Sequence, residues 1–197
     1  NLSDEGYVKK VQGKGTFITY KKEKMYLNKP RGFKETLSSK GHSSKNDIIQ
    51  ASFLNADGDI SEKLSIPLNT KVVYLERLVW EDNEPMAIDK IYIEDEKFPG
   101  FITKLSKDLS FYTILEKDYN IQPKRAVLEI DGIIAQNQHA DLLKCNIGDP
   151  LFSINKISYD FEDKPIHYSS TIVRCDRATY VVHTDNSNMM NTKTKSK

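Results

Sequence analysis

Apolar and polar residues alternate in short stretches along most of the chain, a pattern that predicts strands. We predict strands at about 47–55, 71–80, 85–93, 124–135, 150–161, 165–175 and 178–184. Helical segments are expected between some of these strands and ahead of the first one, at about 33–40, 58–65, 97–104, 109–118 and 137–145.

Two pairs of predicted strands meet at short polar turns, 81–84 (EDNE) and 162–164 (EDK). Such short turns join antiparallel strands, because parallel strands need a much longer crossover. Hairpins with scattered helices predict an α+β fold rather than a doubly wound α/β sheet. We therefore expect a mainly antiparallel sheet with flanking helices.

The front of the chain has a different organisation. The strand-like runs GYVKKV (6–11) and GTFITY (15–20) flank a three-residue turn, which predicts a tight hairpin. The following residues, 21–31 (KKEKMYLNKPR), lack amphipathic order and contain a proline, so we expect a linker. At the other end, the polar residues 186–197 predict a disordered tail.

Composition narrows the class of protein. With 38% hydrophobic and 29% charged residues, the 197-residue chain is typical of soluble globular proteins. It has no apolar run near the roughly 20 residues of a membrane span, and no charged-then-apolar leader. Cys145 and Cys175 have no second cysteine or histidine at metal-ligand spacing, so we expect reduced thiols and neither metal nor cofactor. We predict a cytoplasmic protein.

Positive charge is concentrated at the front. Residues 1–45 carry 11 Lys and Arg against 4 Asp and Glu, whereas the remaining residues carry 18 against 24. A basic front on a mildly acidic body indicates that only the front contacts a polyanion. The alternative is a solvated lysine-rich linker, and charge alone favours that alternative.

An arginine interrupts an apolar strand face in KVVYLERLVW (71–80). Because side chains alternate along a strand, Arg77 shares a face with Leu75 and Val79. A guanidinium there is costly to bury unless an anion meets it. That anion is either a neighbouring carboxylate, the commoner case, or a ligand phosphate or carboxylate bound by the guanidinium fork.

A second strand carries a row of small polar side chains. In PIHYSSTIVRCDR (165–177), His167, Ser169, Thr171, Val173 and Cys175 share one face. Such a row is typical of a pocket wall rather than of a packed core. A half-exposed sheet face is the alternative.

Signatures of catalysis are scarce. The sequence has no GxSxG elbow, no glycine-rich phosphate loop followed by Lys-Ser or Lys-Thr, and no HExxH motif. Its four histidines are scattered along the chain. We therefore expect a binding site without chemistry, and not an enzyme.

The stretch LSDEGYVKKVQGKGTFIT (2–19) resembles the end of the winged helix-turn-helix of the GntR superfamily. The resemblance implies that residues 1–20 close a DNA-reading domain with its wing hairpin, and that 21–31 follow as the linker. Glycines let the backbone approach DNA, and a lysine at the tip reaches phosphates. The implied DNA-contacting residues are Gly13, Lys14, Gly15 and Thr16.

The body, residues 32–185, is similar to the UTRA effector-binding domain of the HutC subfamily, which has the chorismate-lyase-like fold. The phrases that carry the resemblance are GFKETLSSKG, VVYLERLVWEDNEPMAIDKIYI, LSFYTILEKDYNI and GDPLFSINKISYDFEDKPIHYSSTIVRCDRATYVV. The last matches the family's closing phrase at Gly148, Pro150, Leu151, Tyr159, Pro165, Arg174, Asp176 and Arg177.

This resemblance implies a one-component transcription regulator, usually a homodimeric repressor. Its partners would be a small anionic effector such as a sugar phosphate, and operator DNA through the full winged helix domain. Two alternatives stay open. One is a chorismate-lyase-like enzyme acting on an aromatic carboxylate, since fold does not fix function. The other is a dimerisation module whose pocket has lost its role.

The resemblance also implies a set of effector-binding residues. Arg77 stands at the family's first ligand-binding arginine, and Asp89 at an acidic position that contacts sugar hydroxyls. Backbone amides at the start of the first helix would help to hold an anion. The full set is Phe33, Lys34, Arg77, Asp89, Ser110, Tyr112, His167 and Arg174.

Three positions depart from the family pattern. Val79 replaces a second arginine, Val173 replaces a frequent tyrosine, and His167 replaces a frequent glutamate. We therefore expect a single carboxylate or a loosely held phosphate rather than a tightly clamped dianion. An ordinary histidine titrates near pH 6.5, so His167 is expected to make ligand affinity depend on pH between about 6 and 7.

Overall fold

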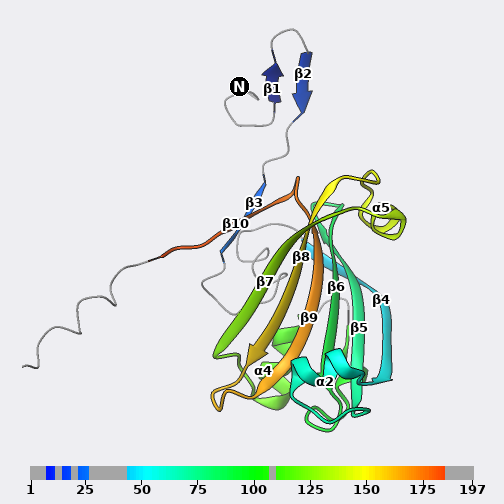
Figure 1. Cartoon of the computed structure of the whole chain (residues 1–197), viewed down its shortest axis with the longest axis vertical. Coiled ribbons are helices and arrows are strands. Elements are labelled where there is room, and N and C mark those ends of the chain that lie inside the picture. The colour runs from blue at the N-terminus through cyan, green and yellow to red at the C-terminus, as the bar shows by residue number, and fades with distance from the viewer. Residues whose placement is uncertain (1–7, 12–14, 19–21, 27–43, 107–109, 185–197) are drawn as a thin grey trace, which may run out of the picture.

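The computed structural model describes residues 8–11, 15–18, 22–26, 44–106 and 110–184 (Figure 1). Several predictions lie outside these residues. They are the helix at 33–40, the tail, and the site residues Gly13, Lys14, Phe33 and Lys34.

Six antiparallel strands form the body, in the order β4-β5-β6-β9-β8-β7 (Figure 1). This sheet and its few helices confirm the predicted α+β fold. The strands are β4 (Ser44–Asn55), β5 (Lys71–Glu81), β6 (Glu84–Glu94), β7 (Arg125–Ile134), β8 (Pro150–Tyr159) and β9 (Pro165–Arg174). The helices are α2 (Gly58–Leu64), α3 (Phe101–Lys104), α4 (Phe111–Tyr119) and α5 (Asn137–Leu143).

Both predicted hairpins are present, joining β5 to β6 and β8 to β9. At the first turn, Asp82 and Asn83 have positive φ angles of 46° and 66°. A two-residue turn of this kind matches the twist of the flanking strands, and Asp and Asn tolerate the left-handed region better than most residues. At the second turn, the Asp160 carboxylate accepts from the backbone N–H groups of Glu162 (3.0 Å) and Lys164 (2.9 Å).

The two faces of the sheet carry different helices. On one face, Val73 and Leu75 of β5 pack with Phe111 and Ile114 of α4 in the largest apolar cluster. On the opposite face, apolar residues of α2 pack near one end of the sheet and those of α5 near the other. Figure 1 shows α2 in front of the sheet and α4 behind it. We call these the α4 face and the α2/α5 face.

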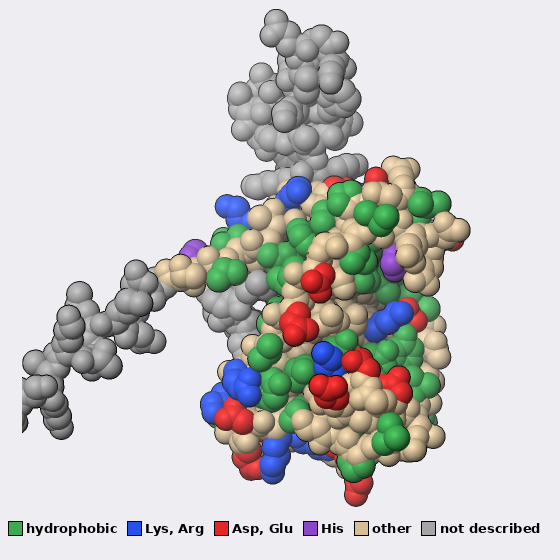
Figure 2. Space-filling model, viewed as in Figure 1, with side chains coloured by type: hydrophobic (Ala, Val, Ile, Leu, Met, Phe, Trp, Pro, Cys, Tyr) green, Lys and Arg blue, Asp and Glu red, His purple; other side chains and the backbone are tan. Residues whose placement is uncertain are grey.

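The α2/α5 face is the side seen in Figure 2, where charged side chains of both signs are interspersed over the lower half of the body. One pair on this face joins Lys90 to Glu76, with 3.8 Å between nitrogen and oxygen. Partly exposed pairs at this separation contribute little to stability.

Outside the body, β1 (Val8–Val11) pairs with β2 (Gly15–Ile18) in antiparallel register, as the predicted hairpin requires. Gly15 and Thr16 therefore lie at the start of β2. Within the described ranges, no helix is long and apolar enough to cross a membrane.

Part of the expected linker is a strand. β3 (Glu23–Tyr26) pairs in parallel with β10 (Ala178–Val181), and the backbone N–H of Glu23 donates to the carbonyl of Arg177 at 2.7 Å. Met25 is 4% exposed and packs in an apolar cluster with Val79, Met86, Ala87, Ile154, Val173 and Ala178. These residues belong to five different strands, so this segment is held to the body by side-chain packing as well as by backbone pairing.

We predict that Met25→Ala lowers the free energy of unfolding by about 2–3 kcal/mol, because it removes a buried side chain and leaves a cavity. Urea denaturation measures the change. The exposed neighbour Lys24 provides the control, and Lys24→Ala is expected to change stability by less than about 0.5 kcal/mol. Equal stabilities for the two variants would show that β3 is not docked in solution.

Candidate ligand-binding site

A buried ion pair lies at the centre of the α4 face. Arg77 on β5 donates from Nε (3.0 Å) and Nη2 (2.7 Å) to Oδ2 of Asp89, which lies directly across on β6. The Thr171 hydroxyl, next across on β9, donates to Oδ1 of the same carboxylate at 2.9 Å. All three residues are less than 9% exposed. The guanidinium charge of Arg77 is therefore balanced by a neighbouring carboxylate, the commoner of the two partners that the sequence left open.

A second polar cluster lies further along the same face of β9. The Tyr112 hydroxyl, from the first turn of α4, lies 3.0 Å from Oγ of Ser158 and 3.2 Å from Nε2 of His167. Nζ of Lys156 on β8 donates to the same hydroxyl at 3.1 Å. The His167 ring also stacks on Phe111, with 4.7 Å between ring centroids. Helix α4 thus brings an aromatic wall and a hydroxyl to the sheet.

His167 is neutral at physiological pH, which corrects the expected titration between pH 6 and 7. Burial lowers the pKa of His167 well below its ordinary value, and the positive charges of Lys156 and Arg77 lower it further. Its Nδ1 is buried and has no hydrogen-bond partner in the described part of the chain. The ring therefore offers one neutral nitrogen for recognition and does not act as a charge switch in this range.

Ser110 has a structural role at the start of α4. As the N-cap, its hydroxyl accepts from the backbone N–H of Thr113 at 3.2 Å. An N-cap side chain satisfies one of the orphan N–H groups of the first turn. Ser110 thereby fixes where the helix begins, and so where Tyr112 meets the sheet.

Arg174 does not join the other predicted site residues. It pairs across with Leu151 and donates from Nη1 to the backbone carbonyl of Leu143 in α5 at 3.1 Å. Its Nε and Nη2 bind the carboxylate of Asp176 at 3.0 and 2.7 Å. Since adjacent strand residues point to opposite faces, Arg174 lies on the α2/α5 face, away from Arg77.

Two residues of this site, Lys156 and Ser158, were not among the site residues predicted from the sequence. Both lie on β8, directly across from Ser169 and His167. Alternation along β8 indicates that they share a face, but only the register between strands places that face beside the polar row of β9. The row itself was predicted, and His167, Ser169 and Thr171 are all buried.

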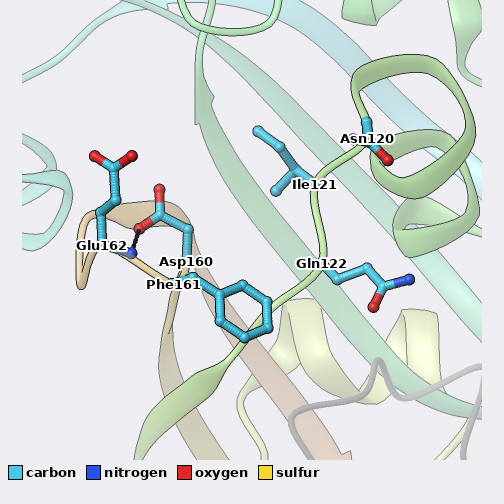
Figure 3. Close-up of a pocket in the computed structure, with 6 residues that line it drawn as sticks. All are labelled: Asn120, Ile121, Gln122, Asp160, Phe161 and Glu162. Carbon is cyan, nitrogen blue, oxygen red and sulfur yellow. Dashed lines mark hydrogen bonds between the residues drawn. The ribbon is translucent and has the colours of Figure 1, made fainter.

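A separate groove of about 520 Å³ lies at the far end of α4 (Figure 3). It is lined by the loop residues Asn120, Ile121 and Gln122 and by the turn residues Asp160, Phe161 and Glu162. None of the predicted site residues lines it. Within the described residues, no group of three or more His, Cys, Asp or Glu side chains is arranged to hold a metal ion.

Comparison with known proteins matches residues 39–179 to the model of the UTRA domain. The chain belongs to the UTRA domain family. The match covers most of the chain and contains all described residues of both polar clusters. The predicted resemblance is thereby confirmed.

The following relatives carry the names of regulators of transcription. The chain is 31% identical to the uncharacterized HTH-type transcriptional regulator YurK of Bacillus subtilis, over 93% of this chain and 76% of that protein. It is 33% identical to the probable fructoselysine utilization operon transcriptional repressor of Shigella flexneri, over 92% of this chain and 74% of that protein. These names support a UTRA effector domain of a transcriptional regulator and not the enzyme alternative.

Solved structures show the same fold. PhnF from Mycobacterium smegmatis superposes with a TM-score of 0.82 at 24% identity, covering 94% of this chain and 81% of that one. The C-terminal domain of YurK from Bacillus subtilis superposes with a TM-score of 0.69 at 24% identity, covering 83% of this chain and all of that one.

We predict that lowering the pH from 7.5 to 5.5 destabilises the protein through His167. Its pKa is lower in the folded state than in the unfolded state. Protonation therefore favours unfolding, and stability is lost as pH falls through about 6.5, the unfolded value. Urea denaturation at the two pH values measures the effect.

His167→Gln removes the titrating group, so the difference in stability between the two pH values should be smaller than in the wild type. The exposed His183 supplies the matched control substitution, His183→Gln, measured at the same two pH values. An equal pH dependence in wild type and His167→Gln would mean that His167 is accessible to protons in the folded state.

Proposed function

We propose that this chain is the effector-binding part of a cytoplasmic, non-enzymatic, one-component transcriptional repressor. Its effector is a small anion bound on the α4 face of the sheet. One observation carries this proposal: a buried and a partly buried hydrogen-bonded polar cluster lie on a sheet face that otherwise carries mainly apolar side chains. Burying that many polar groups is costly, and pockets for small molecules combine apolar walls with a few convergent polar groups in this way.

The spacing of the clusters supports an elongated effector. Arg77 lies on β5 and Lys156 on β8, three strands apart in the order β5-β6-β9-β8. At about 4.8 Å between neighbouring strands, their backbones are about 14 Å apart. Ser169 lies between them, 4% exposed. The site therefore suits a ligand with a negative group and a polar remainder, and not a lone small anion.

The repressor relative from Shigella flexneri is named for fructoselysine utilization. A sugar joined to an amino acid is polar at both ends, and a phosphate would add the anionic group that Arg77 and Lys156 favour. We therefore propose a phosphorylated sugar, with phosphorylated fructoselysine as the first compound to test. In this proposal Tyr112, His167 and Thr171 bind hydroxyl groups of the sugar, and Asp89 orients the Arg77 guanidinium.

Binding of the effector would control operator DNA by linkage. If the effector favours one arrangement of two DNA readers, it lowers operator affinity by the same factor as the operator lowers effector affinity. We assign the DNA contacts to the predicted hairpin residues Gly13, Lys14, Gly15 and Thr16 and to the basic front of the chain, which would bind DNA phosphates.

We predict that phosphorylated fructoselysine raises the melting temperature of this chain, because a ligand that binds the native state stabilises it. Arg77→Met alone would leave the Asp89 carboxylate buried without its partner, at a cost of about 3–5 kcal/mol. The double variant Arg77→Met/Asp89→Asn removes both charges. It should stay folded and bind at least ten-fold more weakly in calorimetric titration, a loss of about 1.4 kcal/mol.

Arg125→Met is the matched control. Arg125 is exposed at the start of β7, pairs with Asp163 at 2.8 Å and belongs to neither cluster. This variant should bind as the wild type does. The proposed site is wrong if the folded double variant binds unchanged, and the effector class is wrong if no anionic sugar shifts the melting temperature.

A symmetric homodimer is the expected assembly, because regulators share the two-fold symmetry of their operators. Light scattering on the chain at tens of micromolar checks this. We expect about twice the mass of 22.6 kDa. A monomer at that concentration contradicts the proposal.

A further inference from the structure

Asn46 is a buried amide that the described protein leaves without hydrogen bonds. It lies on β4, is 2% exposed, and neither its Nδ2 nor its Oδ1 has a hydrogen-bond partner in the described part of the chain. A buried polar group without a partner loses its hydrogen bonds to water and gains none in return, which destabilises the folded state. An asparagine at this position indicates a role other than stability, because an apolar side chain of similar size would not carry that cost.

The register of the strands puts Asn46 on the α4 face. Asn46 lies directly across from Val79, and Ile48, two residues on, lies directly across from Arg77. Residues opposite each other in an antiparallel pair point to the same face. Ile48 packs against the apolar cluster of α4, which confirms this orientation. Lys45, one residue earlier, lies over Trp80 on the other face.

Asn46 is therefore a diagonal neighbour of Arg77. Diagonal pairs on one face have Cβ atoms about 7–8 Å apart, so one small-molecule group can contact both side chains. Asp89 occupies Nε and Nη2 of Arg77, and Nη1 has no hydrogen bond to any described residue. An acceptor on a ligand can use this nitrogen while a neighbouring group reaches the amide.

We infer that Asn46 is a specificity-determining residue, which hydrogen-bonds a neutral polar group of the effector next to the group held by Arg77. An amide both donates and accepts, so its complement also carries a donor and an acceptor, as a sugar hydroxyl does. This inference rests on the proposed function and deepens it. Arg77 and Lys156 select for negative charge, and Asn46 selects for a hydroxyl beside it.

Asn46→Leu tests the inference, with Asn55→Leu as the matched control. Asn55 is the last residue of the same strand and is exposed. The probes are phosphorylated fructoselysine, fructose 6-phosphate and inorganic phosphate, titrated by calorimetry. Urea denaturation of each ligand-free variant is measured in parallel, because it reports whether the amide has a structural partner.

We expect Asn46→Leu to unfold at the same or a higher urea concentration than the wild type. It should bind the two sugar phosphates at least ten-fold more weakly and inorganic phosphate unchanged, and Asn55→Leu should alter none of these affinities. A lower unfolding midpoint for ligand-free Asn46→Leu overturns the inference, since the amide then has a partner within the protein. Unchanged affinity for both sugar phosphates overturns it as well.

Failure of this inference is distinguishable from failure of the proposed function. If Arg77→Met/Asp89→Asn loses sugar phosphate binding while Asn46→Leu keeps it, the anion site stands and the role of Asn46 is wrong. If the wild-type chain binds none of the three probes, both are overturned together.

Discussion

The ion pair between Arg77 and Asp89 is the constraint around which the sheet is organised. Neither charge is tolerable in an apolar interior alone, so each requires the other at hydrogen-bond distance. The two residues lie directly across from each other on β5 and β6, and Thr171 completes the carboxylate's shell from β9. A register slip of one residue on any of these strands would turn one partner to the other face. The pair therefore specifies how the three central strands align.

Charge on the α4 face is balanced in two different ways. Arg77 and Asp89 form a unit without net charge, in which the guanidinium can still donate a hydrogen bond to an anionic ligand group. Lys156 adds positive charge near His167, and together with burial it keeps that ring neutral. The second cluster thus combines a cation with neutral donors and acceptors. A guanidinium in a neutral pair and an ammonium beside uncharged groups favour different ligand groups, which gives the two ends of the site different chemistry.

Most of the fold was predictable from local pattern, whereas the composition of the site was not. The two hairpins follow from short polar turns, and the strands and most helices follow from alternation and spacing within single segments. The polar row of His167, Ser169 and Thr171 also lies within one strand. Lys156, Ser158 and Asn46 come from other strands, and the pairing that brings them together is set by tertiary register. The ion pair itself was foreseen as one of two alternatives, since the choice depends on which strand lies beside β5.

The parallel pairing of β3 with β10 also has a consequence for the order of folding. Its partners, Glu23 and Ala178, are roughly 150 positions apart along the chain, whereas the hairpins join near neighbours. Closing so long a loop costs more entropy than closing a hairpin, and the six-stranded sheet provides the surface on which Met25 packs. We expect this pairing to form last and to open first, so that its amide hydrogens exchange with solvent while the central sheet stays protected. The segment that precedes the body is thus attached to it by the β3–β10 pairing, which we expect to open before the central sheet does.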